Sequence, residues 1–378
     1  MRIVHITRDF PPRMLGGLST AVGGLVSELA RQGCEILVLS FDNYRPNKGP
    51  SGKGGLLCEE AEPGVSVVRI DNSEQLPEAK AIALEYRPEI VHLHHEVLWD
   101  FSHEIASPFA APIVYSVHVL QTEQNRLREI DGTMSSQAQH RALLWSTVIH
   151  APSQIVSDIL TRDDPSTADK IQVIRLGSEF PEFEESEHET GRDTAPLLLY
   201  AGRFADINGF AELLHALPEL FEAHPSLRAI IAGGLPGNRR AQARWQKQWQ
   251  EIAGDLHGRL DFVGWQSPDD LSKLYLRAHM LVVPSWFETF GQVALEGMLH
   301  GTPLIVSDAG ALPELADSDC ATVIPAQDSA AIVAAVHELL ANPEATGAKG
   351  KVAMQRAQAE YRWHERAAEF VRMYRGLV

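Results

Sequence analysis

Short apolar runs alternate along the chain with longer stretches whose apolar residues recur at helical spacing. The first run, residues 2–7, is followed by 19–33, where Ser19 suits a helix N-cap and Gly33 the position after the last turn. Similar runs predict further strands at residues 35–40, 64–70, 89–94, 112–118 and 146–153. Alternating strands and helices are typical of parallel sheets. The first half of the chain therefore predicts a doubly wound α/β domain, residues 1–180.

An acidic stretch poor in aliphatic residues, 181–195, interrupts this pattern and has the composition of a solvated linker. Strand-like runs then resume at residues 197–202, 228–234, 260–265, 280–285, 302–307 and 321–326. Residues 196–360 thus predict a second Rossmann-like domain. Because open α/β sheets bind ligands beyond the carboxyl ends of their strands, we expect the ligand in a cleft between the domains.

Charge and cysteine content exclude several classes of protein. The chain has 378 residues, and 33 Lys and Arg against 50 Asp and Glu give a net charge of −17, which disfavours nucleic acid as a partner. Three widely spaced cysteines form neither a disulfide framework nor a zinc pattern. The start of the chain has no secretory signal and no stretch suits a membrane span, so we expect a cytoplasmic protein with at most peripheral membrane contact.

Familiar phosphate and metal motifs are weak here. Residues 49–55 lack the full P-loop pattern, and the Gly16-Gly17 pair is not part of a dinucleotide fingerprint. His92, His94 and Glu96 superficially resemble a metallohydrolase motif. On a strand, however, His92 and His94 share a face and no Asp-His pair follows, so a metal hydrolase is a remote alternative.

Two further stretches have plain structural interpretations. Asp317 and Asp319 could bind a divalent ion, but a solvated turn is favoured. Residues 239–250 place Trp245 and Trp249 one helical turn apart among cations, which suggests either a membrane-surface helix or two indoles packed on the domain. We favour packing.

The chemistry concentrates in residues 284–310, where a buried strand leads through a loop to a predicted helix closed by Gly301. Glu288 precedes this helix, and Glu296 lies about 7.5 Å along it from Gly291. Free amides at the helix start suit phosphate oxygens. A ligand carrying hydroxyls, then a diphosphate, then a ribose would fit, whereas either acid alone would be read as solvated or ion-paired.

The stretch 284–315 resembles the E-x7-E signature of the retaining glycosyltransferases of family 4, which have the GT-B fold. Four more stretches agree with that family: 14–40, 113–120, 171–180 and 197–217. Residues 361–378 resemble the helix that crosses back to the N-terminal domain in this fold. The resemblance spans nearly the whole chain and is looser in the N-terminal, acceptor-side half.

The resemblance implies catalytic roles for three residues. Glu288 would accept hydrogen bonds from the donor sugar, His118 would contact that sugar near the reacting carbon, and Arg203 would neutralise the phosphates. Further donor contacts are implied at Gly16, Gly17, Asn208, Val263 (base), Thr289, Phe290, Gly291, Gln292 and Glu296 (ribose). No metal and no other cofactor is implied.

Asn208 departs from the family, which has Lys in this loop. Loss of a cation beside a diphosphate weakens the stabilisation of the leaving group. Another cation could replace it, the candidates being Arg8, Arg13, Arg239 and Arg240. Otherwise the enzyme would be slow, or the chain would bind sugar nucleotides or glycans without turnover.

The sequence therefore predicts a metal-independent retaining transferase that moves a sugar from a nucleotide-diphosphate donor, UDP-sugar first, to an acceptor hydroxyl. The acceptor would be a small molecule, a glycan or a lipid-linked group read by residues 119–141. Alternatives are a non-catalytic sugar-nucleotide or carbohydrate-binding protein, an epimerase and a phosphorylase.

Overall fold

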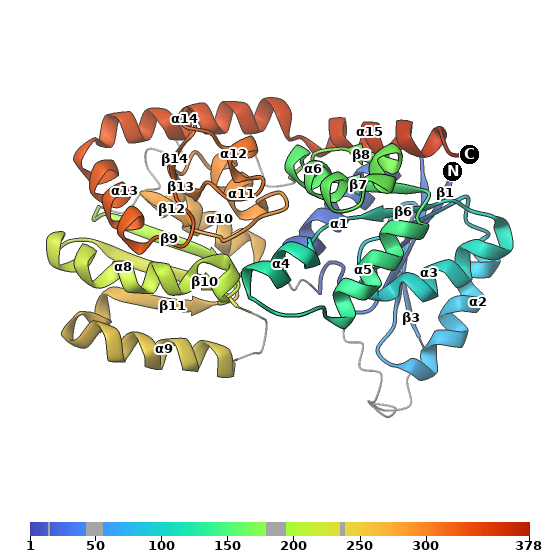
Figure 1. Ribbon diagram of the computed structural model, residues 1–378, viewed down its shortest axis with the longest axis horizontal. Helices are drawn as coiled ribbons and strands as arrows, with labels where there is room; N and C mark the ends of the chain where they lie inside the picture. Colours follow the sequence, from blue (N-terminus) through green and yellow to red (C-terminus); the bar gives the residue numbers. More distant parts are fainter. Residues whose placement is uncertain (14–15, 43–55, 179–193, 235–238) are drawn as a thin grey trace. The chain divides into compact units, whose positions relative to one another are not determined.

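The computed structural model describes residues 1–13, 16–42, 56–178, 194–234 and 239–378, without the side chains of residues 239 and 241. The chain forms two compact units. The first contains Met1–Gly177 and Trp363–Val378, and the second contains Ser178–Arg362. Nearly all of the predicted linker 181–195 lies outside the described residues. Each unit is built on a sheet of its own (Figure 1).

The first unit has an eight-stranded sheet in the order β3-β4-β2-β1-β5-β6-β7-β8. Its strands are β1 (Arg2–Thr7), β2 (Glu35–Ser40), β3 (Leu57–Glu62), β4 (Val65–Arg69), β5 (Ile90–Leu93), β6 (Ile113–Ser116), β7 (Val148–Ala151) and β8 (Ile171–Val173). All neighbours are parallel except β3 and β4. Strands β5, β6 and β7 are buried along their whole length, which explains their continuous apolar runs.

Helices join these strands. They are α1 (Gly17–Arg31), α2 (Leu76–Tyr86), α3 (Trp99–Ala106), α4 (Gln121–Leu127), α5 (Met134–Trp145), α6 (Gln154–Asp163) and α15 (Trp363–Arg375), with short 3₁₀ helices η1 (Ser73–Gln75), η2 (Glu96–Leu98), η3 (Ser107–Phe109) and η4 (Pro165–Lys170). The indole of Trp363 lies so close to Gly24 that a Cβ there would come within 2.0 Å of it. Glycine in α1 thus lets the C-terminal helix α15 pack on the first unit.

The second unit has a six-stranded parallel sheet in the order β11-β10-β9-β12-β13-β14. Its strands are β9 (Leu197–Gly202), β10 (Arg228–Gly233), β11 (Leu260–Gly264), β12 (Met280–Val283), β13 (Leu304–Ser307) and β14 (Ala321–Ile324). Its helices are α8 (Phe210–Ala223), α9 (Arg239–Ala253), α10 (Pro268–Arg277), α11 (Gln292–Leu299), α12 (Leu312–Leu315), α13 (Ser329–Ala341) and α14 (Pro343–Glu360), with η5 (Asp206–Asn208) and η6 (Gly254–Arg259). The predicted fold of two Rossmann-like sheets is confirmed.

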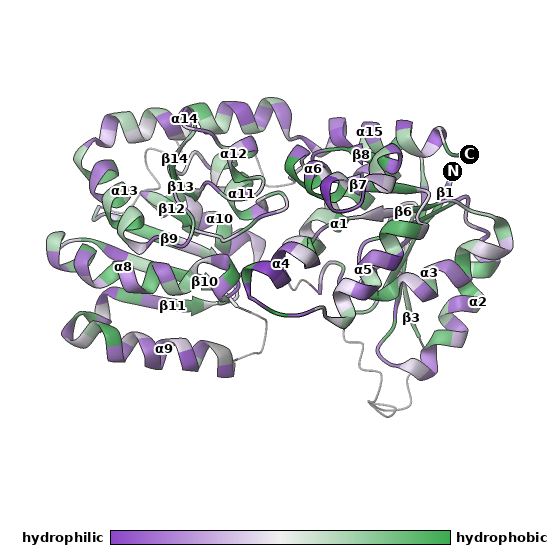
Figure 2. Ribbon diagram, in the orientation of Figure 1, coloured by the Kyte–Doolittle hydropathy of each residue, from purple (hydrophilic) through white to green (hydrophobic). Residues whose placement is uncertain are grey.

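Helix α9 settles the choice left open for residues 239–250. Trp245 and Trp249 are buried in the core cluster of the second unit. Their indole N–H groups donate to the carbonyls of Phe204 and His257, at 3.3 and 3.1 Å. Hydrophilic residues predominate along the rest of α9 (Figure 2). The indoles are therefore core residues, as favoured from the sequence, and are not available to a membrane surface.

Two strands were not predicted. β3 is exposed or half-buried along its length and so has no apolar run, while β8 has only three residues at the edge of the sheet. Within the described residues, no helix has the length and apolar character needed to cross a membrane.

The strand orders locate the point in each sheet where the chain reverses its direction of growth. In the first unit this switch point lies between β1 and β5, and in the second between β9 and β12. Ligands of open α/β sheets bind beyond the carboxyl ends of the strands at such points. The loops that follow these four strands are therefore the first places to look for a site.

Candidate active site

In the second unit, the loops after β9 and β12 are joined directly beside the switch point. The backbone N–H of Trp286 donates to the carbonyl of Ile207 at 2.9 Å, and its indole N–H donates to Glu212 Oε1 at 3.0 Å. This holds η5, which ends at Asn208, against the loop that carries Glu288. The structure thus brings together two predicted donor-binding segments that are about 80 residues apart in the chain.

Glu288 is a partly buried carboxylate in this loop. It accepts a hydrogen bond from Ser285 Oγ at 2.9 Å. Burial raises the pKa of Glu288, while the Ser285 hydrogen bond and the positive charge of Arg203 act in the opposite direction. Arg203 itself is exposed and forms no ion pair within the described part of the chain. A carboxylate suited to sugar hydroxyls therefore lies near a guanidinium that is available to an anion.

Close backbone approaches fix the Glu288 loop. Gly310 passes so near that a Cβ there would lie 2.1 Å from the Glu288 carbonyl oxygen, and the neighbouring Ala311 N–H donates to that oxygen at 2.8 Å. At Gly209, a Cβ would lie 1.9 Å from the carbonyl oxygen of Pro284. Only glycine fits at these two positions, so the close approach of the two backbones depends on Gly209 and Gly310.

Helix α11 (Gln292–Leu299) confirms the helix predicted in this stretch, and Gly291 is its N-cap. Gly291 has φ 102°, a left-handed conformation that favours glycine, and no side chain caps the helix. The first backbone amides of α11 are thus without a side-chain cap, and together with the helix dipole they suit phosphate oxygens. Phe290 is buried, and Thr289 and Gln292 are half-buried at this helix start.

Glu296 lies farther along α11 and is 6% exposed. The hydroxyl of the buried Tyr275 donates to Glu296 Oε2 at 2.7 Å. Burial raises the pKa of Glu296 to about 7, a shift that the Tyr275 hydrogen bond only partly opposes. Tyr275 was not predicted as a site residue, and its place on α10 gave no sequence signal for this contact.

Asn208 is half-buried, and its Oδ1 is buried without a hydrogen-bond partner among the described residues. The same is true of Glu212 Oε2. A buried polar atom left unpaired is costly, so unpaired acceptors beside a switch point indicate a place where a ligand supplies hydrogen bonds.

Val263 lies apart from this group. It is exposed in β11, which is separated from β12 by β10 and β9. Its carbonyl already accepts the Gln266 side-chain amide at 2.9 Å. A hollow of about 740 Å³ beside Val263 is lined by residues of α9, η6 and β11 together with Ile230 and Arg277, and includes neither Glu288 nor Glu296.

In the first unit, Gly16 and Gly17 follow β1 and lead into α1. Both are exposed, and a Cβ at Gly16 would meet no atom within 4 Å in the described structure. No neighbouring atom in the described structure therefore requires Gly16 to be glycine. Its backbone does, because φ is 157°, a conformation that L side chains rarely adopt.

His118 follows β6 and belongs to a buried group of histidines. Its Nε2 lies 3.0 Å from His94 Nδ1, and His94 Nε2 lies 2.9 Å from His5 Nδ1. Burial lowers the pKa of His118 and of His5 to about 3, and lowers that of His94 well below its usual value. All three imidazoles are thus neutral near pH 7.

A second chain of hydrogen bonds starts at His92. Its Nδ1 is 2.6 Å from the Tyr374 hydroxyl and its Nε2 is 2.7 Å from Ser116 Oγ, which in turn is 2.7 Å from His150 Nδ1. His150 Nε2 is 2.7 Å from the carbonyl of Ile174, which can only accept. Each proton is therefore assigned: His150 carries its proton on Nε2, Ser116 donates to His150, His92 donates to Ser116, and Tyr374 donates to His92.

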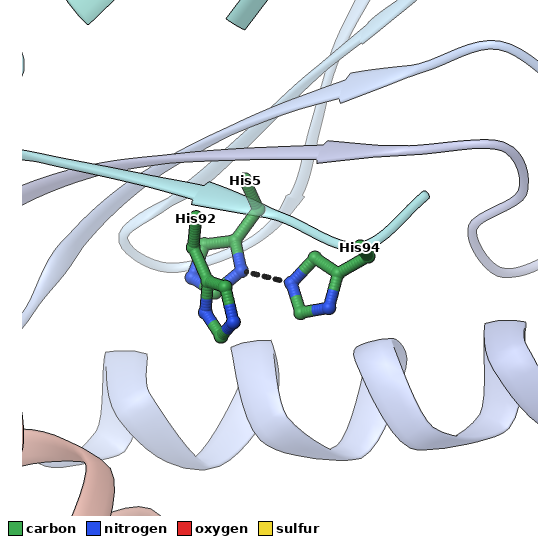
Figure 3. A group of neighbouring side chains, drawn as sticks. All are labelled: His5, His92 and His94. Atoms are coloured by element: carbon green, nitrogen blue, oxygen red, sulfur yellow. Dashed lines mark hydrogen bonds between the residues drawn. The ribbon is translucent and has the colours of Figure 1, made fainter. Parts of the chain in front are cut away.

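These chains bear on the idea of a metal site. His5, His92 and His94 lie close enough for one nitrogen of each to come within 4.8 Å of the others (Figure 3). Both nitrogens of His92 and both of His94 are, however, already hydrogen-bonded, and the group contains no carboxylate to balance a buried cation. The residues present do not fit a metal ion.

Glu96 is not part of this group. It accepts a hydrogen bond from Gln121 Nε2 at 2.9 Å, so the set of His92, His94 and Glu96, kept as a remote alternative, does not form. Asp317 pairs with Arg356 at 3.0 Å and accepts from the Asp319 N–H, which confirms a turn rather than an ion site.

The sequence analysis missed His5, Ser116 and His150. A signal existed, because each is polar within an apolar strand. His5 stands opposite His92 in the register of β1 and β5, and Ser116 stands opposite His150 in that of β6 and β7. The strand order needed to see these pairs was not available from the sequence.

Comparisons with known proteins decide the family. The family described as "Glycosyltransferase Family 4" matches residues 15–178, and "Glycosyl transferases group 1" matches residues 195–342. The chain belongs to this family of glycosyltransferases. The E-x7-E resemblance of residues 284–315 is thereby confirmed, and the chain is a transferase with the GT-B fold.

Curated relatives cover nearly the whole glycosyltransferase. "Glycogen synthase" of Mycobacterium tuberculosis is 27% identical over 99% of this chain and 94% of its own. "D-inositol 3-phosphate glycosyltransferase" of Corynebacterium efficiens is 24% identical over 95% and 90%. Among solved structures, sucrose-phosphate synthase of Thermosynechococcus elongatus has a TM-score of 0.81 at 22% identity, covering 100% of this chain and 98% of its own.

Within this glycosyltransferase, the cations proposed to replace the family's Lys at position 208 differ in availability. Arg13 lies 3.7 Å from both Asp42 and Asp71 and is committed to them. Arg8 is half-buried and Arg240 is exposed, and neither forms an ion pair within the described residues. The side chain of Arg239 lies outside the described structure. In the second unit, Arg203 is the cation that acts on Glu288.

Proposed function

We propose that this glycosyltransferase moves a sugar from a nucleoside diphosphate, with UDP as the expected nucleotide, to an acceptor hydroxyl with retention of configuration and without a metal ion. One observation carries this proposal. At the switch point of the second unit, the loops that hold Glu288 also hold the start of α11, which no side chain caps, and the guanidinium of Arg203, which has no ion pair in the described parts of the chain. Glu296 lies farther along the helix. Glu288 suits the sugar hydroxyls, Arg203 and the start of α11 suit the diphosphate, and Glu296 suits the ribose.

Front-face transfer fits these groups. The bond between the anomeric carbon and the diphosphate oxygen breaks, the acceptor oxygen bonds to that carbon on the same face, and the acceptor proton passes to the departing phosphate oxygen. Arg203 and the first amides of α11 are placed to stabilise the negative charge that develops. Glu288 would accept hydrogen bonds from sugar hydroxyls, for which it must be ionised despite its raised pKa.

Neighbouring structures support the donor class. Anabaena HepE, solved with UDP and glucose, has a TM-score of 0.79 at 16% identity and covers all of this chain. Starch synthase IV of Arabidopsis thaliana, solved with ADP and acarbose, has a TM-score of 0.70 at 14% identity. Uracil and adenine are thus both bound on this fold, and we place UDP first. Relatives named for glycogen, inositol phosphate and sucrose phosphate favour a polyhydroxylated acceptor.

A second function follows from Asn208, because its unpaired Oδ1 stands where the family has a cation. The chain would then bind sugar nucleotides with little or no turnover. Thermal-shift titration with UDP, GDP, ADP and dTDP in a chelator tests binding, since a ligand of the folded state raises apparent stability. Release of sugar from the donor that binds, and the anomeric configuration of the product by NMR, then test transfer. No stabilisation by any of the four would contradict both functions.

A further inference from the structure

We infer that Tyr275 is a positioning residue whose hydroxyl orients the Glu296 carboxylate and leaves Oε1 as the oxygen offered to a ligand. The basis is the buried hydrogen bond of 2.7 Å that the Tyr275 hydroxyl donates to Glu296 Oε2. That the ligand is the ribose of a nucleotide rests on the proposed function. The orientation of the carboxylate belongs to the free protein and is testable without a ligand.

The two oxygens of the Glu296 carboxylate have different surroundings. Oε2 accepts from Tyr275, whereas Oε1 accepts no hydrogen bond from the residues that the structure describes and is not among their buried polar atoms without a partner. Oε1 therefore keeps access to solvent or a ligand, although Glu296 as a whole is only 6% exposed. Because Oε2 is held, Oε1 points in one direction before a ligand binds, which lowers the entropy cost of binding.

Tyr275 is itself held firmly. It is fully buried, its carbonyl accepts from Thr302 Oγ1 at 2.8 Å, and its ring centre lies 5.0 Å from that of His300. His300 Nδ1 lies 2.7 Å from the Glu296 carbonyl and Nε2 lies 2.7 Å from Ser272 Oγ. Side chains of α10 thus reach the end of α11 at two places, through Ser272 and Tyr275, and only Tyr275 reaches the carboxylate.

The direction of this hydrogen bond is fixed by proton affinities. Burial and the negative charge of Glu296 raise the pKa of Tyr275 well above its usual value, so the phenol stays protonated and donates. Burial raises the pKa of Glu296 to about 7, and the Tyr275 hydrogen bond opposes that rise. Among the described residues no charged group adds to these two causes, and His300 contacts the Glu296 carbonyl rather than its carboxylate. Without the Tyr275 hydroxyl, Glu296 should therefore hold its proton to higher pH.

Two matched variants each remove one hydroxyl that joins α10 to the end of α11. Tyr275→Phe loses the hydrogen bond to the Glu296 carboxylate and keeps the ring that packs against His300. Ser272→Ala loses the hydrogen bond to His300 and leaves the carboxylate untouched. Both variants weaken the packing of the two helices, but only Tyr275→Phe should change the titration of Glu296.

Carbon NMR of the full chain with ¹³C-labelled glutamate carboxyls reads this titration without a ligand. The Glu296 signal is assigned by its loss in Glu296→Gln. We expect the wild type and Ser272→Ala to titrate with a pKa of about 7, and Glu296 in Tyr275→Phe to be a weaker acid by about tenfold. An unchanged pKa of Glu296 in Tyr275→Phe would overturn the inference.

Affinity for the nucleoside diphosphate found by thermal shift gives the second reading. Near pH 7, Tyr275→Phe should bind it about five- to tenfold more weakly than the wild type, because less of Glu296 is ionised and available as a charged acceptor. By about pH 9, where both proteins have an ionised Glu296, the difference should shrink to about twofold. Ser272→Ala should follow the wild-type pH profile. The phosphates of the ligand titrate alike in all three proteins and do not affect the comparison.

A double-mutant cycle shows whether Tyr275 acts through Glu296. In the Glu296→Gln background, Tyr275→Phe should change the affinity by no more than about twofold at any pH, since no carboxylate is left to orient. Equal losses of affinity in Tyr275→Phe and Ser272→Ala at every pH would overturn the inference, because Tyr275 would then serve packing alone. If the NMR titration shifts as expected but none of the four diphosphates binds, the proposed function fails and the orientation of Glu296 by Tyr275 stands.

Discussion

The two sheets of this glycosyltransferase are built alike, but the side chains beside their switch points differ in chemistry. In the second unit, the groups beside β9 and β12 are charged and incompletely paired: among the residues that the structure describes, Arg203 has no ion pair and Glu212 Oε2 has no hydrogen-bond partner. In the first unit, beside β1, β5 and β6, the groups are neutral imidazoles that are hydrogen-bonded to one another. Arg203 is suited to bind an anion and the Glu212 carboxylate oxygen to accept from a hydroxyl, whereas the imidazoles are largely engaged with one another.

Removing the free guanidinium should have the largest effect. Arg203→Ala should lower kcat/KM by about 10²–10³-fold, because a positive group aimed at the leaving phosphate acts mainly in the transition state. Initial rates with the donor identified by thermal shift measure this. Arg228→Ala, at the start of β10 and paired with Asp261 at the surface, is the control. Equal losses in both variants would show that Arg203 has no special role.

The hydrogen-bonded chain of His92, Ser116 and His150 should respond in stability rather than in catalysis. Ser116→Ala removes the acceptor for His92 and the donor to His150 at a site that is 1% exposed. We expect the free energy of unfolding to fall by about 1–3 kcal/mol, the usual cost of stranding buried polar groups. Urea unfolding measures it, and exposed Ser318→Ala is the control. A marked change in KM without a loss of unfolding free energy would show that this chain of hydrogen bonds belongs to the site itself.

Glu296 combines features of both groups: it is buried like the histidines, and it must be ionised to serve as a charged acceptor for ribose hydroxyls. Glu296→Gln should weaken nucleotide binding by about tenfold by removing a charge-assisted acceptor. It should also remove a pH dependence of stability. The folded-state pKa is raised from 4.5 to about 7, so the folded protein holds this proton where the unfolded chain has lost it. Stability from this group is therefore lost as the pH rises from about 4.5 through about 7.

Melting temperatures of wild type and Glu296→Gln across that pH range check the sign. The variant should gain relative to wild type as the pH rises, while its affinity for the nucleotide falls. Exposed Glu251→Gln on α9 should change neither. A variant that loses stability at high pH would mean that Glu296 is ionised and well paired in the folded protein, contrary to its surroundings.

The second unit was more predictable from the sequence than the first. Its helix start at Gly291, its Glu288 and its Glu296 lie in one stretch, so local pattern and spacing were enough. The histidine chain joins His5 of β1 to residues that follow β5 and β6, and only the strand order places His5 beside His94. Val263, expected by resemblance to meet the nucleotide base, lies in β11, and two strands separate β11 from β12. Contacts across a sheet depend on register and order, which a single sequence does not provide.

The smallest expected effect tests whether the second unit lacks a charge. Asn208→Lys should leave kcat/KM unchanged or raise it by up to about tenfold, because the substitution adds a cation. Loss of the Asn208 amide breaks no hydrogen bond to Oδ1 among the described residues. Asn208→Gln, which changes length without charge, is the matched control. A gain with Lys alone would show that Arg203 does not fully meet the leaving-group charge. Collapse with Lys but not with Gln would show that the site already has its full positive charge, and that Asn208 Oδ1 serves as an acceptor for the ligand.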